Sequence, residues 1–576
     1  MKERTLFSVL TMMLLLSVMA GCQSPTSGSV QGPTAGTAAQ SNAPQAAKRL
    51  SAALMSAPTV LSSVIRPLGQ GIPGVTELEK FVSAGLTISD DHNVQQPQLA
   101  EQTPTIENGL WKLLPDGRMQ TTWVMRDNAM WHDGVPVTAD DMVFTIMVAQ
   151  DRDVASFYQA PLDLIESVQA DSPRSVTVTW KQPYISADTL FSSGPGLAFA
   201  LPMPKHLLGT AYEQDKMNLT SLSYWNKDYV GAGPFRVAQW NEGTGVVLTA
   251  NDQFVLGRPK LDEIDVKFIA DSSALVATIL AGAVDVTIGR TLSLEQSLQV
   301  RDRWQAGGIE TGDFTNVILL YPQFINPDPA VVGDVRFRRA MLQAINRQEM
   351  ADTFEAGLAP AADSYMNPND AAYASVQTQI VRYAFDPRAA MDAIAGLGYV
   401  RGADGMFHDA AGQPLSVELR TTQGDDLQEK SVFSTAQYWQ SAGVMVQQNL
   451  IPPELANGRE YRNTFGGFDL KRQPGGNDFL DRVNSAKTPL PENNFVGNNY
   501  NRYMNPEFDA LLARYFSTIP LSDRMNVLGQ IIHHMTDQVL YLTLFFQASP
   551  TVVGSHLKGV TQYCEGWNAS TWDLTG

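Results

Sequence analysis

The first 22 residues constrain what this chain can become, because they determine the compartment in which it folds. Lys2 and Arg4 precede an apolar run over residues 6–19, which ends at Ala20-Gly21-Cys22. A positive start, an apolar centre and small residues before a cleavage point are the pattern of a secretory signal peptide, which we assign to residues 1–21. The run is about 14 residues long, whereas a membrane-spanning helix needs roughly 20. We therefore expect the body of the chain to fold outside the cytoplasm.

The cysteine at the end of this run predicts a lipid anchor. Ala20-Gly21-Cys22 resembles the lipobox of bacterial lipoproteins, with Met19 in place of the more usual leucine, and this resemblance implies that the Cys22 thiol carries the lipid. Residues 22–47 contain little to bury and are expected to form a flexible tether. The alternative is an ordinary signal peptide with a chance cysteine. The only other cysteine is Cys564, so an acylated Cys22 leaves no internal disulfide and the fold must depend on its core.

Composition and charge exclude several classes of partner. The formal net charge is −18, with 41 Lys and Arg against 59 Asp and Glu, which argues against nucleic acid or an anionic membrane surface as the partner. The chain is 44% hydrophobic and 17% charged, as is typical of globular proteins. No later stretch approaches about 18 uninterrupted apolar residues, so the lipid is the only membrane attachment that we expect.

The body alternates strand-like and helix-like patterns, which indicates an α/β architecture. Apolar residues at every second position predict strands over residues 176–180 and 263–269. Asn505 suits a helix N-cap and Pro506 the first helical position, so a helix is predicted to begin there.

Two further helices are predicted from their caps. Thr138 with Asp141 resembles a capping box, and the helix behind it is expected to turn Val143, Ile146 and Met147 inward. Asp334 can cap another helix, with Gly357 as its stop.

The patterns of common active sites are missing or misplaced. Gly69-Gln70-Gly71-Ile72-Pro73-Gly74 matches a dinucleotide-binding fingerprint, but Pro73 is awkward in a loop that must open a helix, and a glycine-rich turn is the better interpretation. The adjacent His533 and His534 would point about 100° apart on a helix and cannot easily share a metal. Asp425-Asp426 is interpreted as a pair of helix-start or surface charges. The sequence contains no P-loop, no H-E-x-x-H and no G-x-S-x-G. We therefore expect no catalytic residue, no metal and no cofactor.

One segment is far more specific than these. Residues 125–141 have the sequence Met-Arg-Asp-Asn-Ala-Met-Trp-His-Asp-Gly-Val-Pro-Val-Thr-Ala-Asp-Asp. They resemble the signature L-R-x-G-V-x-W-H-D-G-x-P-[VF]-T-A-x-D-V of the peptide/nickel class of solute-binding proteins of ABC importers, family 5, with slight departures at Asn128 and Ala129. The residues themselves predict a strand, a tight His-Asp-Gly turn and a capped helix.

Further segments resemble the same family in the same order. They are residues 204–208 (P-K-H), 231–235 (G-T-G-P-[YF]), 251–262 (N-x-x-Y-W-x-G-x-P-x-L-D), 280–285 (L-x-x-G-E-x-D), 334–347 (D-V-R-V-R-Q-A…A-I-D-R) and 505–509 (N-P-E-F-D). The resemblance covers roughly residues 95 to 560.

The resemblance implies an α/β fold of the periplasmic-binding-protein kind, type II, with two lobes that close by a hinge on a solute. We expect a discontinuous main lobe over residues 48–85, 200–312 and 541–576, an inserted subdomain over 86–199, and a second lobe over 313–540. The chain is expected to act as a monomer, and its loaded form to be recognised by permease subunits with a separate ATPase.

The residues that would hold the solute are less clear. In peptide-binding members, an aspartate in a W-x-A-D-Y-x-D-P segment holds the peptide amine, and the corresponding residues 468–479 lack that segment. Asp478 is the nearest carboxylate, and Arg472 could clamp a ligand carboxylate, although both could be ordinary surface charges. The remaining candidates are aromatic side chains that could line the cleft or pack in the core: Trp439, Trp567 and Trp572, of which Trp567 has the most polar neighbours.

The sequence therefore predicts a lipid-anchored receptor, on the outer face of the cytoplasmic membrane or in the periplasm, that captures solutes for an ABC importer and is not an enzyme. Oligopeptides or dipeptides lead as ligands because of the family, and oligosaccharides, metal chelates and other organic solutes stay open. Two other functions also stay open. One is sensing or chaperoning with the same fold, and the other is a tethered hydrolase, for which the sequence offers no nucleophile–base or metal constellation.

Overall fold

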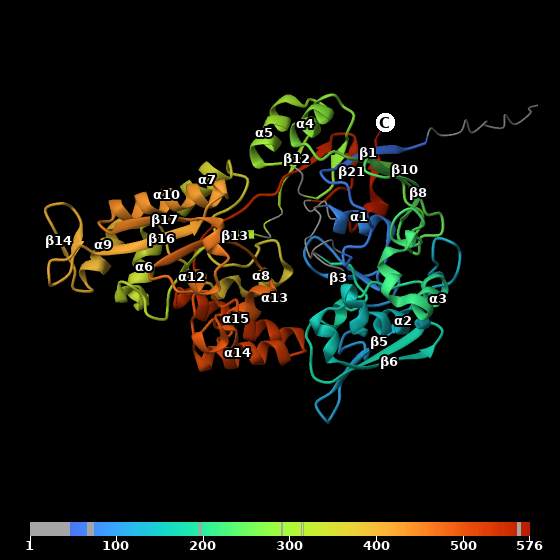
Figure 1. Ribbon diagram of the computed structural model, residues 1–576, viewed down its shortest axis with the longest axis horizontal. Coiled ribbons are helices and arrows are strands. Elements are labelled where there is room, and N and C mark those ends of the chain that lie inside the picture. Colours follow the sequence, from blue (N-terminus) through green and yellow to red (C-terminus); the bar gives the residue numbers. More distant parts are fainter. Residues whose placement is uncertain are drawn as a thin grey trace, which may run out of the picture. The chain divides into compact units, whose positions relative to one another are not determined.

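The computed structural model describes residues 47–575, apart from 66–73, 195–198, 290–291, 313, 315 and 562–565 and the side chains of 477 and 478. The predicted signal peptide, Cys22 and most of the predicted tether therefore lie outside the described residues. Three sheets organise the described part of the chain, and each is packed against its own helices (Figure 1). In the described residues, no helix is both long enough and apolar enough to cross a membrane.

The first sheet joins strands from distant parts of the chain. Its order is β12-β20-β11-β1-β10-β9-β8. The strands are Arg49–Leu54 (β1), Phe235–Asn241 (β8), Gly245–Ala250 (β9), Glu263–Phe268 (β10), Val286–Thr287 (β11), Gly307–Glu310 (β12) and Thr551–Gly554 (β20). The central strand β1 is parallel to β10 and β11, and the other pairs are antiparallel.

Both faces of this sheet are covered, because alternate residues of β1 enter different cores. Leu50, Ala52 and Leu54 belong to the core beneath helix α1 (Val75–Val82), while Ala53 belongs to the core beneath α4 (Ser272–Leu280) and α5 (Leu294–Arg303). On the α1 side, the ring of Phe81 lies 5.4 Å from that of Trp572 in an edge-to-face contact. Trp572, near the end of the chain, thus packs in the same core as the residues of β1.

A smaller antiparallel sheet lies between β3 and β8 in the chain. Its order is β4-β5-β7-β6. The elements of this region are β2 (Thr87–Ser89), β3 (Gln95–Pro97), β4 (Trp111–Leu113), β5 (Met119–Val124), α2 (Ala139–Gln150), β6 (Ile165–Ser172), β7 (Ser175–Trp180) and α3 (Lys205–Asp215). The alternating buried side chains of β5 and β7 pack under α2, which is how a period-two pattern produces a half-buried sheet.

Three of the segments that carry the family resemblance meet in space. The His132 N–H donates to the Gly231 carbonyl at 2.8 Å, and its ring nitrogens contact the Gly231 N–H at 3.2 Å and the Gly233 carbonyl at 3.1 Å. His206 contacts the Asp133 carboxylate at 2.7 Å. Burial lowers the pKa of His132 to about 4, so this ring is neutral near pH 7 and can both accept and donate. The motif residues therefore tie the segment before α2 to α3 and to the segment that leads into β8.

The third sheet organises the second lobe. Its order is β17-β16-β18-β13-β19. The strands are Asn316–Pro322 (β13), Ser416–Thr422 (β16), Met445–Ile451 (β17), Phe468–Pro474 (β18) and Leu542–Phe546 (β19). Strand β16 is parallel to β17 and β18, whereas β13 is antiparallel to β18 and β19.

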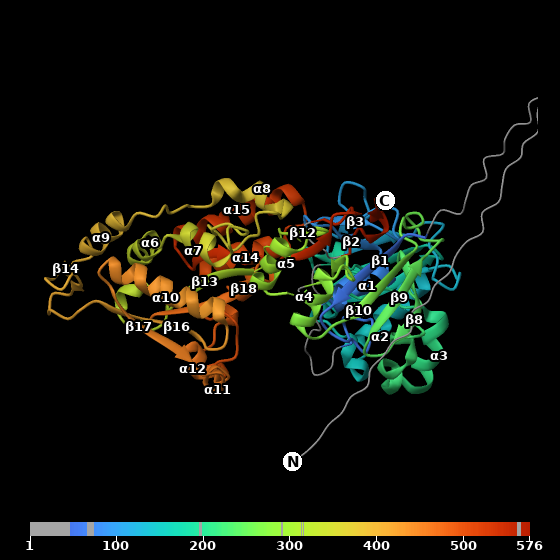
Figure 2. The same ribbon diagram turned by 90° about the horizontal axis from the view of Figure 1, so that it is seen from above.

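Helices cover both faces of this sheet (Figures 1 and 2). One face packs against α6 (Val335–Gln343), α7 (Arg347–Phe354), α9 (Pro387–Ala395) and α10 (Asp426–Ser441). The other packs against α8 (Ala371–Val376), α13 (Asn477–Arg482), α14 (Pro506–Ser517) and α15 (Leu521–Asp537). The remaining elements are the short helices α11 (Pro453–Ala456) and α12 (Arg459–Asn463) and the hairpins β14–β15 (Val400–Arg401, Phe407–His408) and β21–β22 (Leu557–Lys558, Asp573–Leu574).

The chain passes between the first and third sheets twice, from β12 to β13 and from β19 to β20. At the second-lobe end of these crossings, the Gln547 N–H donates to the Asn316 carbonyl at 2.9 Å, so the two segments are tied to each other. Two neighbouring segments that connect two lobes and are bonded to each other can act as a hinge.

The helix caps were predicted better than the helix lengths. Asn505 caps α14 by accepting from two backbone N–H groups, and the Thr138–Asp141 capping box of α2 is present. The inward position of Met147 was wrong, since it is 47% exposed. A single helix from Asp334 to Gly357 was also wrong, because Asn346 breaks it by capping α7.

The sheet membership bears on the predicted lobe boundaries. Strands of the first sheet fall in the three segments assigned to the main lobe, and β4 to β7 fall in the predicted inserted subdomain. Strand β19, however, follows residue 540 and pairs with β13 of the second lobe. The sheet places the last strand of the second lobe at Leu542–Phe546, beyond the predicted boundary.

We predict that Trp439→Phe destabilises the second lobe. Trp439 on α10 is fully buried, its Nε1–H donates to the Met341 carbonyl at 2.9 Å, and its ring lies 4.8 Å from that of Phe468. Losing the hydrogen bond and leaving a small void should cost about 2 kcal/mol, measured as the urea midpoint of unfolding. The control is Phe433→Ala on the exposed side of the same helix, where little change is expected. Equal midpoints for the two variants would contradict the prediction.

Candidate functional site

The edge of the third sheet nearest the crossings is the candidate site. Strands β16 and β18 are parallel, so their carboxyl ends lie at one edge, and α10 begins there. In open α/β sheets, ligands bind outside the carboxyl ends of the strands. The register places Arg472 opposite Ile318 and Pro474 opposite Asn316, the residue tied to the second crossing. The position where ligands usually bind therefore lies next to the crossings that form the hinge.

Arg472, predicted to clamp a ligand carboxylate, lies at this edge and already has partners. Its guanidinium forms an ion pair with Asp425 and a hydrogen bond to the Gln547 side chain at 3.3 Å. Asp425 is also the N-cap of α10, where it accepts from the Gln428 N–H at 3.2 Å. Sequence reasoning treated Asp425 as a helix-start or surface charge and missed this pairing, because the two residues are far apart in the chain.

A buried carboxyl group lies beside the same edge. Glu355, at the end of α7, is 1% exposed and accepts from the Ala548 N–H at 2.9 Å. Burial raises its pKa to about 7, and the hydrogen bond and the charge of Arg472 oppose the rise. Glu355 thereby links the second lobe to the second crossing, and nothing in the local sequence marks it as special.

The other predicted site residues are spread over the chain. The side chain of Asp478, in the first turn of α13, and all of Cys22 lie outside the described residues. Trp439 and Trp572 are buried in the cores of the second lobe and the main lobe. Both rings are closed to a solute in this structure, and their predicted binding roles stay predictions.

Trp567 differs from the other two tryptophans, since it is partly exposed and its Nε1–H donates to Thr561 at 3.2 Å. An aromatic ring with an exposed part and a satisfied N–H can still offer a face to a ligand. Of the three predicted tryptophans, Trp567 alone keeps this possibility in the structure.

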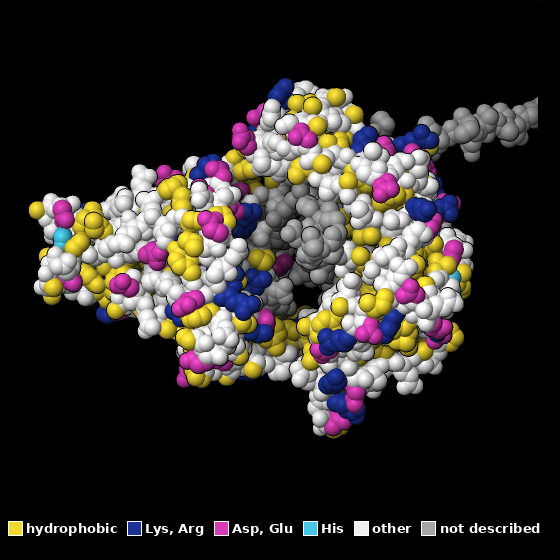
Figure 3. Space-filling model, in the orientation of Figure 1, with side chains coloured by type: hydrophobic (Ala, Val, Ile, Leu, Met, Phe, Trp, Pro, Cys, Tyr) yellow, Lys and Arg dark blue, Asp and Glu magenta, His cyan; other side chains and the backbone are white. Residues whose placement is uncertain are grey.

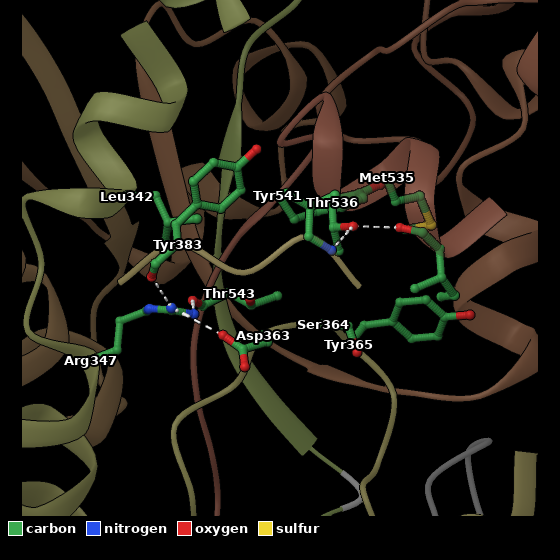
Figure 4. Close-up of a pocket in the computed structure, with 12 residues that line it drawn as sticks. Leu342, Arg347, Asp363, Ser364, Tyr365, Tyr383, Met535, Thr536, Tyr541 and Thr543 are labelled. Atoms are coloured by element: carbon green, nitrogen blue, oxygen red, sulfur yellow. Dashed lines mark hydrogen bonds and ion pairs between the residues drawn. The ribbon is translucent and has the colours of Figure 1, made fainter. Parts of the chain in front are cut away.

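A small pocket inside the second lobe is lined by tyrosines and by the Arg347–Asp363 pair (Figure 4). The guanidinium of Arg347 also donates to the carbonyls of Ala362 at 2.5 Å and Tyr383 at 2.7 Å, so its donors are taken by Asp363 and by the backbone. The space open to water is about 20 Å³, which suits one water molecule and no larger solute. We interpret this pocket as structural.

Charge gathers on the side of the second lobe that borders the hollow between the lobes. Lys and Arg side chains line its rim in the space-filling view (Figure 3).

Among the described residues, no group of three or more His, Cys, Asp or Glu side chains is arranged to hold a metal. His534 contacts the Tyr503 hydroxyl at 2.9 Å and His533 the Gln379 carbonyl at 3.3 Å, so the two histidines point to different partners.

The sequence match that identifies the family covers most of the chain. The family described as bacterial extracellular solute-binding proteins, family 5 Middle, matches residues 95–495. The chain belongs to this family. The oligopeptide-binding protein AppA of Bacillus subtilis (strain 168) is 23% identical over 501 residues, which is 84% of this chain and 84% of that protein.

Solved structures of the family share the fold. That of AppA from Bacillus subtilis in complex with a nonapeptide matches with a TM-score of 0.59 and 20% identity, over 92% of this chain and 100% of the other. That of NikZ from Campylobacter jejuni in complex with Ni(L-His) matches with a TM-score of 0.62 and 22% identity, over 91% and 99%. The predicted family and the two-lobed α/β fold class are thus confirmed.

We predict that Glu355→Gln makes the protein less sensitive to rising pH. A carboxyl group whose pKa is raised from 4.5 to about 7 by folding holds its proton more tightly in the folded state, so stability falls as pH rises between these values. The difference in the free energy of unfolding, variant minus parent, should therefore grow by roughly 3 kcal/mol as the pH rises across this range. Above this range the difference should stay constant.

The measurement is urea unfolding of both proteins from pH 4.5 to pH 8. The control is Asp352→Asn on the exposed side of the same helix, which removes a carboxylate without removing a buried one. A difference between Glu355→Gln and the parent that stays constant from pH 4.5 to pH 8 would show that folding does not perturb Glu355.

Proposed function

We propose that this chain is the solute-binding component of an ABC importer and that it captures oligopeptides or dipeptides between its two lobes. The observation that carries this proposal is the family membership together with AppA, an oligopeptide-binding protein, which matches over 84% of both chains. The linked crossings at the candidate site add a physical reason, since a ligand that touches both lobes favours the closed state.

The candidate contacts are Arg472 at the edge of the third sheet, Asp478, and Trp567 from the main lobe. The Arg472 guanidinium is held in place by Asp425, and a positioned guanidinium pays less entropy when it binds a carboxylate. The same pairing reduces its net charge, so Arg472 is better suited to orient a solute than to hold it alone.

A metal chelate is the second candidate solute. NikZ, which has the same fold, is described in complex with Ni(L-His), and the amine-holding segment of peptide-binding members is absent over residues 468–479. Oligosaccharides and other organic solutes are further alternatives that the same binding experiment tests.

We further propose that the chain binds without catalysis, works as a monomer and is anchored by a lipid on Cys22. In such an importer, ATP is hydrolysed by a separate ATPase that acts on the permease, and the receptor needs no nucleotide site. The sequence agrees with this, since it contains no P-loop. The anchor would hold the folded body at the outer face of the cytoplasmic membrane or in the periplasm.

The proposed receptor role predicts that peptides stabilise the protein. At a free concentration 100 times its dissociation constant, a ligand that binds only the folded state adds about 2.7 kcal/mol. Thermal unfolding of the full-length protein, with pools of random di-, tri- and pentapeptides, oligosaccharides or the nickel complex of L-histidine, measures this effect. A shift with sugars or the nickel complex, and none with peptides, would replace the peptide assignment; turnover of any bound compound would contradict binding without catalysis.

The proposed anchor predicts that Cys22→Ser moves the protein from the membrane fraction to the soluble fraction and abolishes labelling by radioactive palmitate in a bacterial host. The matched control is Cys564→Ser, which removes the only other thiol and should change neither. Membrane-bound, labelled Cys22→Ser protein would refute the lipid assignment.

A further inference from the structure

The turn between β2 and β3, in the predicted inserted subdomain, bonds directly to the second lobe. The turn is residues 90–94, and its partner is the segment 367–371, which ends in the first residue of α8. The Ala371 N–H donates to the His92 carbonyl at 3.1 Å, and the His92 Nδ1 contacts the Asn369 carbonyl at 3.0 Å. Because a carbonyl only accepts, the His92 ring is the donor in the second bond. We call these two bonds the interlobe contact.

The turn has a fixed shape of its own. One oxygen of the Asp90 carboxylate accepts from the N–H groups of His92 and Val94, both at 2.9 Å. The other oxygen accepts from the Gln96 side chain at 2.8 Å. Asn93 has a φ of 59°, a conformation that asparagine tolerates better than most residues. His92, Asn93 and Val94 are exposed, so the interlobe contact lies at the surface and can break without opening a core.

The partner segment is tied to the first crossing. The Asn369 side chain donates to the Gly312 carbonyl at 2.8 Å, and the Asn369 N–H donates to the Asn367 side chain at 2.9 Å. Gly312 lies between β12 and β13, where the chain first passes to the second lobe. Asn369 therefore bonds to the crossing with its side chain and to the His92 ring with its carbonyl. The hinge and the interlobe contact are linked through this one residue.

Two other contacts between the subdomain and the second lobe define their relative position less sharply. The Arg524 guanidinium on α15 lies 3.5 Å from the Ile185 carbonyl, which is long for a hydrogen bond. The apolar core that the two parts share depends on buried area and not on direction, so its surfaces can slide. Two hydrogen bonds between segments of fixed shape, in contrast, are made together in one relative position.

We infer that the interlobe contact holds the lobes together when no solute is bound, and that it thereby sets the affinity for every solute by the same factor. The apparent affinity of a receptor scales with the fraction of molecules that are already in the binding form. A bond between the lobes changes this fraction whatever the solute is, whereas a residue that touches the solute favours some solutes over others. The effect on affinity rests on the receptor role proposed above, but the effect on the lobes does not.

The charges around His92 make the interlobe contact sensitive to pH. Asp90 and Asp91 lie in the same turn, and Asp370 precedes α8. The bond to the Asn369 carbonyl raises the pKa of the His92 ring, slight burial opposes the rise, and the three carboxylates add to it. Burial raises the pKa of Asp370 to about 6, so above this value its carboxylate attracts the protonated ring. Because the pKa of His92 is raised in the contact, the contact should weaken as the pH rises through that pKa.

The distance between two spin labels on the full-length, solute-free protein tests the inference. Nitroxide amino acids are placed at the exposed positions Met217, before the first crossing, and Val400, in the second lobe. Short distances should dominate in the parent, and the ratio of long to short distances should rise about two- to tenfold in Ala371→Pro and in His92→Ala, as expected for one lost hydrogen bond. Proline suits the first position of a helix, so Ala371→Pro removes the N–H donor and keeps α8.

Matched controls separate the interlobe contact from the substitutions themselves. Arg459→Pro places a proline at the first position of α12, and His408→Ala removes a histidine whose pKa is raised by Asp404 of the same hairpin. Both should keep the distances of the parent, and thermal unfolding shows that each variant is folded. From about pH 6.5 to pH 8.5, long distances should increase in the parent and in His408→Ala, and less in His92→Ala. Glu355 titrates beside the second crossing in all of these proteins, so the comparison between them isolates His92.

Titration with pooled random tripeptides and with the nickel complex of L-histidine measures the affinity. Ala371→Pro should weaken each probe that the parent binds by one factor, equal to the fall in the short-distance population. Parent-like distances in both Ala371→Pro and His92→Ala would overturn the inference, and unequal factors for the two probes would show that the segment touches the solute instead. If the parent binds neither probe, the receptor role is wrong for these solutes, while the distances still decide whether the contact holds the lobes.

Discussion

The chain joins its two lobes by two crossings, and the rest of the structure depends on this constraint. The first sheet must take its strands from both ends and the middle of the chain, because everything from β13 to β19 is committed to the second lobe. The hydrogen bond between Gln547 and Asn316 joins the two crossings at the edge of the third sheet. One core of each lobe is its own, whereas the core under α2 continues into the core against α14 and α15. A change in the relative position of the lobes must therefore rearrange this shared core while the two separate cores keep their contacts.

The polar chemistry gathers where the crossings enter the second lobe. Glu355 reaches the backbone of the second crossing, while Arg472 reaches both the start of α10 through Asp425 and the same crossing through Gln547. A solute that binds Arg472 would therefore act on groups already bonded to the hinge. This arrangement differs from the pocket beside Arg347, where the guanidinium is bound to Asp363 and to backbone carbonyls and the space is that of one water molecule.

Local signals in the sequence were sufficient for strands, helix starts and the family. The His-Asp-Gly turn could be predicted because glycine readily adopts a positive φ, which is 85° here, and because a capping box follows within four residues. The break at Asn346 was missed because the apolar spacing continues past it, and only the cap geometry separates α6 from α7. The contacts of His132 with Gly231 and Gly233 and of Arg472 with Asp425 join residues far apart in sequence. A single sequence carries no signal for such pairs, so most of the candidate site had to come from the structure.

A contact confined to the second lobe limits what a solute can do there. A contact that is equal in the open and closed forms shifts no equilibrium between them. If a solute binds Arg472, closure must therefore be driven by the remainder of that solute against the other lobe. The residues that orient a solute and the residues that favour closure are then different residues on different lobes.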